Sequence, residues 1–399
     1  MLWSCRCCLI ILHLAALLLN DSFFSPSRFG VYAFNQIGKP RLLTSQTTKE
    51  EWLKRRQDIQ KTFRDQVYGA VPSVPYKLQF DVRQRPNHSL QGKAILYLVG
   101  ITISTDTGSF SFPFHLFVPE TEKDKQFPAF ILVWNRETLK PLSPDSEYWP
   151  VEQLVDSGFA TATFWAGDVD PDDQIDDFQN GIHPLFDQGN RYGNSWGAIA
   201  AWAFGASRIL DCLEQHFEST IDPTKVAVVG HSRGGKTALW AAAEDERFAL
   251  AISNNSGCTG AALSKRKQGG NFGETVMQIN NIFPNWFCKN YRLFNGKEEE
   301  LPVDQHMLLA LIAPRALAVA SATLDDWADP LGEYLSTRDA SQIWSLHGID
   351  STLPENQPEP ESPIRKGKVQ YHLRSGFHDL NLYDWKQYIS MAKYVFGSK

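Results

Sequence analysis

The first third of the chain passes from an amphipathic segment to long runs of alternating apolar and polar positions. Residues 50–67 carry apolar side chains at helical spacing among many charges, which predicts a surface helix. Two extended stretches follow, 76–82 and 94–118, with turn residues between and within them. They predict antiparallel strands that open a larger sheet.

Beyond residue 125 the pattern changes to short, continuous apolar runs that alternate with helical segments. Such runs are typical of strands buried on both faces, and their alternation with helices predicts a mostly parallel sheet with helices on both sides. The expected strands lie at 129–134, 159–164, 225–229, 249–253, 316–320 and 369–373. The expected helices include 196–217, 236–243 and 385–395. The pattern therefore predicts a three-layer α/β sandwich with antiparallel N-terminal strands.

The N-terminal segment has the features of an export signal. Arg6 precedes an apolar stretch at 9–19, and small residues near Ala33 offer a cleavage site. An apolar stretch of about 11 residues is too short to span a bilayer. We therefore expect a signal peptide at 1–33, a single domain at 34–399, and a secreted or periplasmic protein without stable membrane association after processing. An uncleaved membrane anchor is the alternative.

Charge and cysteine content narrow the function classes. The formal net charge of −6 gives no reason to expect nucleic-acid binding, which usually requires a basic face. The cysteines beyond the leader are Cys212, Cys258 and Cys288, so at most one disulfide can form among them. Beyond the leader the chain contains no Cys-x-x-Cys, and it contains no His-Glu-x-x-His, so we expect neither a metal nor a cofactor.

The pentapeptide at 230–234, Gly-His-Ser-Arg-Gly, fits the pattern Gly-x-Ser-x-Gly. It directly follows one predicted strand and directly precedes a predicted helix. In that context the serine occupies a sharp turn above the sheet, near backbone N–H groups that can stabilise a developing oxyanion. The motif predicts a serine esterase of the α/β-hydrolase type with Ser232 as nucleophile; an idle serine in a glycine-rich turn is the alternative.

A catalytic triad on this fold requires an acid and a histidine after the serine. His378 follows the last strand, where the base is expected, whereas His372 lies within the strand and is expected to be packed. Asp325 and Asp326 both follow the strand at 316–320, and their positions alone favour neither.

Two cations lie in the first turn of the helix that follows the serine. Arg233 and Lys236 are each unfavourable there by a few tenths to about 1 kcal/mol, because a helix N-terminus is itself positive. An anionic ligand or transition state would explain both. We expect Arg233 to support the oxyanion and Lys236 to bind an oxygen-rich substrate.

Motifs in seven segments, one of which contains the serine turn, carry a family resemblance. The segments are 196–199, 230–240, 255–262, 302–306, 313–315, 325–330 and 374–378. Together they resemble the glucuronoyl esterases, carbohydrate esterase family 15, in their bacterial form, and the resemblance covers roughly residue 50 to the C-terminus.

The resemblance implies an α/β-hydrolase that cleaves esters between 4-O-methyl-glucuronic acid on xylan and lignin alcohols, without a cofactor. We expect a monomer. It marks Ser232, His378 and Arg233 as catalytic. Fungal-type members carry their acid where this chain has Asn255, which cannot supply a charge. The bacterial-type pattern places an aspartate two residues before a tryptophan, which implies Asp325 as the acid.

The resemblance also marks the residues that contact the sugar, which are Lys236, Glu274 and Trp327. The stretch 267–272 is longer than the family's usual spacing before Glu274, so a solvated carboxylate at a helix start is the alternative for that residue. Alternative functions are a secreted acetyl-xylan or feruloyl esterase on the same fold and a non-catalytic, hydrolase-like binding protein. An acetyl group needs neither Lys236 nor Trp327, and the binding protein predicts loss of a triad member.

Overall fold

The computed structural model describes residues 42, 47–85, 89–120, 125–136, 146–175, 178–266 and 273–397. The expected signal peptide at 1–33 and the long stretch at 267–272 lie outside these residues. The strands are β1 (Lys77–Gln84), β2 (Ala94–Thr105), β3 (Gly108–Pro119), β4 (Phe127–Trp134), β5 (Ala160–Trp165), β6 (Ile221–His231), β7 (Leu250–Asn254), β8 (Ala316–Ala322), β9 (Ile364–Lys366) and β10 (Val369–Arg374).

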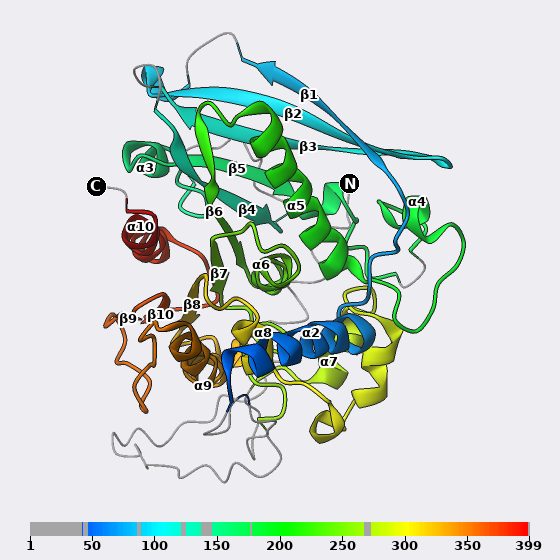
Figure 1. The fold of residues 1–399 in the computed structure, drawn as a ribbon, viewed down its shortest axis with the longest axis vertical. Coiled ribbons are helices and arrows are strands. Elements are labelled where there is room, and N and C mark those ends of the chain that lie inside the picture. The colour runs from blue at the N-terminus through cyan, green and yellow to red at the C-terminus, as the bar shows by residue number, and fades with distance from the viewer. Residues whose placement is uncertain are drawn as a thin grey trace, which may run out of the picture. The chain divides into compact units, whose positions relative to one another are not determined.

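These strands form one ten-stranded sheet in the order β1-β2-β3-β5-β4-β6-β7-β8-β10-β9 (Figure 1). The first three strands pair antiparallel, as the alternating pattern predicts, and β3 is antiparallel to β5. From β5 to β10 the neighbours are all parallel, and the short β9 is antiparallel to β10. In the centre of the sheet, Val228 of β6 pairs with Ile131 of β4 on one side and Ala251 of β7 on the other.

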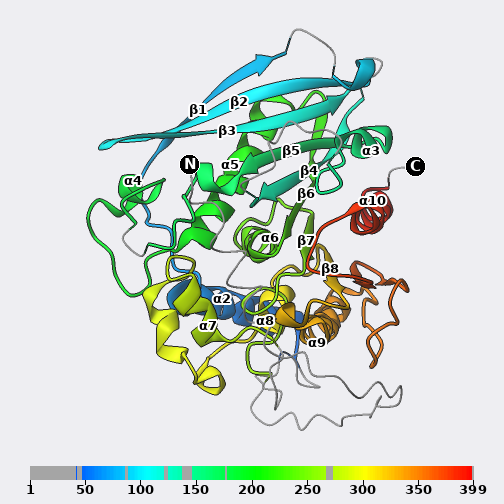
Figure 2. The same ribbon diagram turned by 180° about the vertical axis from the view of Figure 1, so that it is seen from behind.

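Helices cover both faces of the sheet. They are α2 (Lys49–Gln66), α3 (Val151–Asp156), α4 (His183–Asp187), α5 (Ala198–His216), α6 (Arg233–Glu244), α7 (Val276–Ile282), α8 (Gln305–Ala310), α9 (Pro330–Ser341) and α10 (Leu382–Phe396). Helices α2, α5, α6, α8 and α9 pack into one apolar core, whereas α3 and α10 pack into a second core on the opposite face. Figures 1 and 2 show α3 and α10 together on one side of the sheet.

The burial pattern explains why these segments are strands. All eight residues of β4 are buried, because helices lie on both of its faces, and this is why the segment reads as a continuous apolar run. In β1 exposed and partly buried residues alternate over the first six positions, as expected for an outer strand with one solvated face. The predicted α/β sandwich is confirmed, with most element ends within a few residues of those expected. No helix in the described ranges has the length and apolar character needed to cross a bilayer.

Candidate active site

The carboxyl ends of the parallel strands meet at one edge of the sheet, where ligands of open α/β sheets bind. Each of the six parallel strands is followed there by a polar residue of the candidate site or by one of its partners. These residues are Asn135 after β4, Asp172 after β5, Ser232 after β6, Asn255 after β7, Asp325 after β8 and His378 after β10.

Ser232 occupies a strained turn between β6 and α6. Its backbone lies in the left-handed half of conformational space, with φ 58° and ψ −127°, which a non-glycine residue adopts only when its surroundings impose it. A Cβ on Gly230 would lie 2.0 Å from the carbonyl oxygen of Gly234, so the turn closes only with glycine there. The Ser232 N–H donates to the carbonyl of Asn254 at 2.9 Å, which ties the turn to β7. The local geometry is that expected of a nucleophile at a helix N-terminus.

The loops after β8 and β10 bring His378 and Asp325 together. Nδ1 of His378 lies 2.6 Å from Oδ2 of Asp325, and the same oxygen accepts a hydrogen bond from Nδ2 of Asn255 at 2.7 Å. The Asp325 side chain is 3% exposed, whereas that of His378 is 40% exposed and faces solvent in part. Asp326 is exposed, and the hydrogen bond of His378 is to Asp325, not to Asp326. A buried carboxylate on Nδ1 leaves Nε2 available for proton transfer.

His378 also lies beside His231, the residue before the serine. Their ring centroids are 4.3 Å apart. Burial lowers the pKa of His231 well below its usual value, and the neighbouring His378 lowers it further. His231 is therefore neutral and does not oppose a positive charge on His378. In the part of the chain that the structure describes, no hydrogen bond joins the Ser232 hydroxyl to His378; such bonds often tighten only when substrate binds.

Three other histidines follow Ser232 in the chain, and His347 lies at the end of a short 3-10 helix, Gln342–His347, before the last two strands. His372 lies inside β10, fully buried, with Nε2 2.9 Å from Oδ1 of Asp384, so the expectation that it is packed is confirmed. His306 lies buried in α8. None of the three follows the last strand as His378 does, which leaves His378 as the histidine that the fold brings to the serine turn.

Arg233 is held beside the serine by groups from two other strand ends. Its Nε lies 2.8 Å from Oδ2 of Asp172, and its Nη2 donates to the carbonyl of Asn135 at 2.7 Å. The second oxygen of Asp172 accepts a hydrogen bond from the indole N–H of Trp286 at 2.6 Å. Burial raises the pKa of Asp172, while the charge of Arg233 lowers it. Asp172 therefore holds the Arg233 guanidinium in place, and Trp286 in turn holds Asp172.

Lys236 lies inside the protein, one turn further along α6. Its Nζ donates to the carbonyls of Ser256 and Cys258 at 2.7 and 2.6 Å, and lies 3.3 Å from Oε2 of Glu274. The side chains of Lys236 and Glu274 are each 4% exposed. The ammonium therefore has a complete set of acceptors, which a buried cation requires.

Glu274 connects Lys236 to Trp327. Oε1 of Glu274 accepts a hydrogen bond from the indole N–H of Trp327 at 3.2 Å, and the Glu274 backbone N–H donates to the Trp327 carbonyl at 2.9 Å. Trp327 is 47% exposed, so its ring is open to solvent at the site. Burial raises the pKa of Glu274 even though Lys236 opposes the shift. The alternative of a solvated carboxylate at this position is wrong, because the side chain is buried.

The two cations of α6 are less unfavourable than their helix position suggests. Each has a carboxylate from a distant loop, Asp172 for Arg233 and Glu274 for Lys236. An anionic ligand is therefore not needed to explain why both are present. Asp172 and Trp286 were not identified from the sequence, although a signal existed: Asp172 belongs to an acidic run directly after a buried strand.

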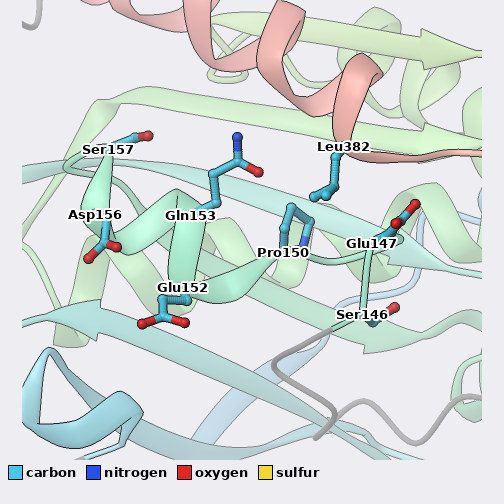
Figure 3. A pocket seen from close by; sticks show the side chains of 8 residues that line it. All are labelled: Ser146, Glu147, Pro150, Glu152, Gln153, Asp156, Ser157 and Leu382. Carbon is cyan, nitrogen blue, oxygen red and sulfur yellow. The ribbon is translucent and has the colours of Figure 1, made fainter.

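Neither the cysteine thiols nor the surface pocket beside α3 belongs to the candidate active site. In the described ranges no group of three or more His, Cys, Asp or Glu could hold a metal, and Cys212, Cys258 and Cys288 are buried with free thiols. Figure 3 shows a surface pocket between α3 and the start of α10, with Leu382 above the carboxylates of α3. Its lining contains neither a histidine nor any residue of the candidate site.

The parallel sheet, the serine turn after β6 and the acid and histidine after β8 and β10 define an α/β-hydrolase. Residues 101–348 match the family described as "Glucuronyl esterase, fungi". A carbohydrate esterase from an unknown prokaryotic organism is 37% identical to this chain over 88% of its length and 86% of the relative's. A relative from Phanerochaete carnosa, named 4-O-methyl-glucuronoyl methylesterase, is 36% identical over 44% of each chain.

Solved structures agree with these relatives. A glucuronoyl esterase from Solibacter usitatus superimposes with a TM-score of 0.79 at 35% identity, covering 90% of this chain and 98% of the other. A promiscuous esterase of carbohydrate esterase family 15 from a marine bacterial metagenome superimposes with a TM-score of 0.77 at 37% identity, covering 89% and 96%. The chain belongs to the glucuronoyl esterase family, and the resemblance stated from its motifs is confirmed.

Proposed function

We propose that this protein is a secreted serine esterase that hydrolyses esters of 4-O-methyl-D-glucuronic acid, carried on xylan, with lignin alcohols. The observation that carries the substrate assignment is the group formed by the buried Lys236 and Glu274 and the exposed ring of Trp327. A relative from Phanerochaete carnosa bears the name of this activity. Glucuronoxylan or a lignin–carbohydrate ester is the partner, and a monomer suffices because all the proposed residues come from one chain.

The proposed reaction has two acyl-transfer steps. His378, oriented by Asp325, takes the proton of Ser232 as its Oγ attacks the ester carbonyl. The alcohol leaves with that proton from His378, and an acyl-enzyme remains. Water then attacks the acyl-enzyme with His378 again as base, and the free uronic acid is released.

Charge develops on the carbonyl oxygen in both steps. Backbone N–H groups at the start of α6 stabilise it, together with Arg233. The contacts of Arg233 to Asp172 and Asn135 support this role, because they hold the guanidinium next to Ser232 before substrate arrives. A donor that is already oriented costs no reorganisation during the reaction.

We propose that the sugar contacts Trp327, Glu274 and Lys236. The exposed ring of Trp327 offers an apolar face, and each oxygen of Glu274 keeps a lone pair that can accept from a ring hydroxyl. Lys236 would exchange one of its protein acceptors for a hydroxyl oxygen when the sugar binds. Both oxygens of Glu274 already have protein partners, so the carboxylate is oriented before a hydroxyl approaches. An acetyl ester has no hydroxyl for these groups to bind.

The test compares purified enzyme on the methyl and benzyl esters of glucuronic acid with an acetyl ester. We expect kcat/KM at least tenfold higher for the glucuronate esters, and loss of all hydrolysis in Ser232→Ala. Ser345→Ala is the matched control, because Ser345 is an exposed serine whose hydroxyl, among the described residues, donates only to the Gln342 carbonyl. A preference for acetyl would favour an acetyl-xylan esterase, and absence of any turnover would favour a binding protein.

A further inference from the structure

A further buried carboxyl group, that of Glu333, lies in the first turn of α9. Glu333 is 0% exposed. Its Oε1 accepts hydrogen bonds from the backbone N–H groups of Ser256 and Gly257, at 2.7 and 3.0 Å, and its Oε2 accepts from the Ser321 hydroxyl at 2.6 Å. In the described ranges it forms no ion pair with a cation.

The segment that Glu333 holds, residues 255–258, is irregular backbone after β7. Asn255 and Gly257 both have positive φ, 47° and 62°, so this stretch continues neither the sheet nor a helix. Successive backbone N–H groups in such a conformation form a small concave site that favours an anion or a carboxyl oxygen. Glu333 fills this site from outside the segment.

The same segment contacts both halves of the candidate active site. The side chain of Asn255 donates to Oδ2 of Asp325, the proposed acid. The carbonyls of Ser256 and Cys258 accept from Nζ of Lys236, the proposed sugar contact. A shift of this segment would therefore move the acid and the ammonium together.

We propose that Glu333 is a positioning residue for the esterase reaction, which sets the orientation of Asp325 and Lys236 through the segment 255–258. It touches neither substrate nor reacting atoms. An apolar side chain at this position would leave two adjacent N–H groups and a hydroxyl without acceptors, and a buried donor without an acceptor forces its surroundings to move. The part of the inference that concerns Lys236 rests on the proposed function.

The experiment compares three substitutions of Glu333 with a control. Glu333→Gln keeps an acceptor for both N–H groups and can donate to Ser321, whereas Glu333→Met keeps the volume but no acceptor. Glu333→Asp keeps the carboxyl group but retracts its oxygens by one methylene. Tyr334→Phe removes a hydrogen bond to the Pro354 carbonyl from the next residue of α9, without touching the segment.

Turnover is measured per labelled serine, with a fluorophosphonate probe to count competent enzyme, on methyl glucuronate and on p-nitrophenyl acetate. We expect Glu333→Met and Glu333→Asp to lower kcat at least tenfold on both esters and to raise KM for the glucuronate only. Glu333→Gln and Tyr334→Phe should keep kcat and KM within about threefold of the parent.

Two results would overturn the proposal. The first is parental kcat and KM in Glu333→Asp, and in Glu333→Met if it folds, with only a lower Tm, which is what a purely structural residue predicts. The second is a loss in Glu333→Gln as large as that in Glu333→Met. If the parent fails to hydrolyse glucuronate at all, the proposed function fails, while the acetate arm still tests the link to Asp325.

Discussion

Replacement of Asp325 by asparagine tests the triad most directly, and the structure allows the loss to be estimated. Oδ2 of Asp325 accepts from His378 at 2.6 Å and from Asn255 at 2.7 Å, while Oδ1 has no hydrogen bond among the described residues. Two donors thus converge on one oxygen. An introduced amide can satisfy both by placing its carbonyl oxygen there, so His378 keeps its tautomer and loses only the neighbouring charge.

The lost negative charge of Asp325 sets the size of the expected fall in kcat. A unit charge about 4 Å from the imidazolium is worth about 4 kcal/mol at an effective dielectric constant of about 20. Each 1.4 kcal/mol is about a factor of ten in rate. We therefore expect Asp325→Asn to lower kcat about 10³-fold, whereas Asp326→Asn, on an exposed side chain, should change it less than threefold.

The second donor makes the prediction sharper. With Asn255→Ala, nothing but His378 orients the introduced amide, which can then turn its NH₂ group toward the ring and impose the wrong tautomer. In a serine-protease triad, an asparagine that imposes the wrong histidine tautomer lowers kcat about 10⁴-fold. The loss caused by Asp325→Asn should therefore be about tenfold larger in the Asn255→Ala background than in the parent.

The assay is a double-mutant cycle on kcat, measured with p-nitrophenyl acetate so that it does not depend on the sugar assignment. Circular dichroism and Tm check that the variants remain folded. An Asp325→Asn variant that keeps more than a tenth of the parental turnover would show that this residue is not the acid. Strictly additive effects of the two substitutions would refute the role of Asn255 in orienting the acid.

Three further outcomes are expected. Lys236→Met should raise KM for glucuronate esters at least tenfold and destabilise the protein by about 3–5 kcal/mol, because it leaves the buried Glu274 without its partner. Adding Glu274→Gln should restore Tm but not KM; an unchanged Tm in the single variant would contradict the buried pair. Burial raises the pKa of Glu333 to about 8 from 4.5, so the native state holds a proton that the unfolded state releases. The unfolding free energy should therefore fall as pH rises from about 4.5 to about 8, and urea titrations should find this slope reduced in Glu333→Gln; an equal slope in both would exclude Glu333 as its source. Gly230→Ala places a Cβ 2.0 Å from the Gly234 carbonyl, so we expect little folded protein and no activity, and a stable, active variant would show that the turn is not closed as described.

Much of this protein was predictable from local pattern. The strands and helices follow from the spacing of apolar residues. A strand buried on both faces must be apolar throughout, and an amphipathic helix must carry apolar residues every three or four positions. The serine turn was predictable for a similar reason: a Cβ on Gly230 would meet the Gly234 carbonyl of the same turn, so this glycine is required by the local backbone, whereas a Cβ on Gly234 would meet the Val133 carbonyl of the neighbouring strand at 3.0 Å. His378 followed from its place after the last strand.

The tertiary structure decided which side chains face one another. Position along the chain left Asp325 and Asp326 equivalent, and only the resemblance separated them; in the structure the first is buried against His378 and the second is exposed. The charges of Arg233 and Lys236, which the sequence presents as unfavourable, are offset by Asp172 and Glu274.

Glu333 shows the same limit most clearly. Nothing in the helix around it distinguishes it from a surface glutamate, yet it is fully buried against the backbone of a segment 76 residues away. Local pattern reports whether a residue suits a helix or strand. Partners across such separations depend on how parallel strands align and where their loops converge, so they become visible only when the sheet is assembled.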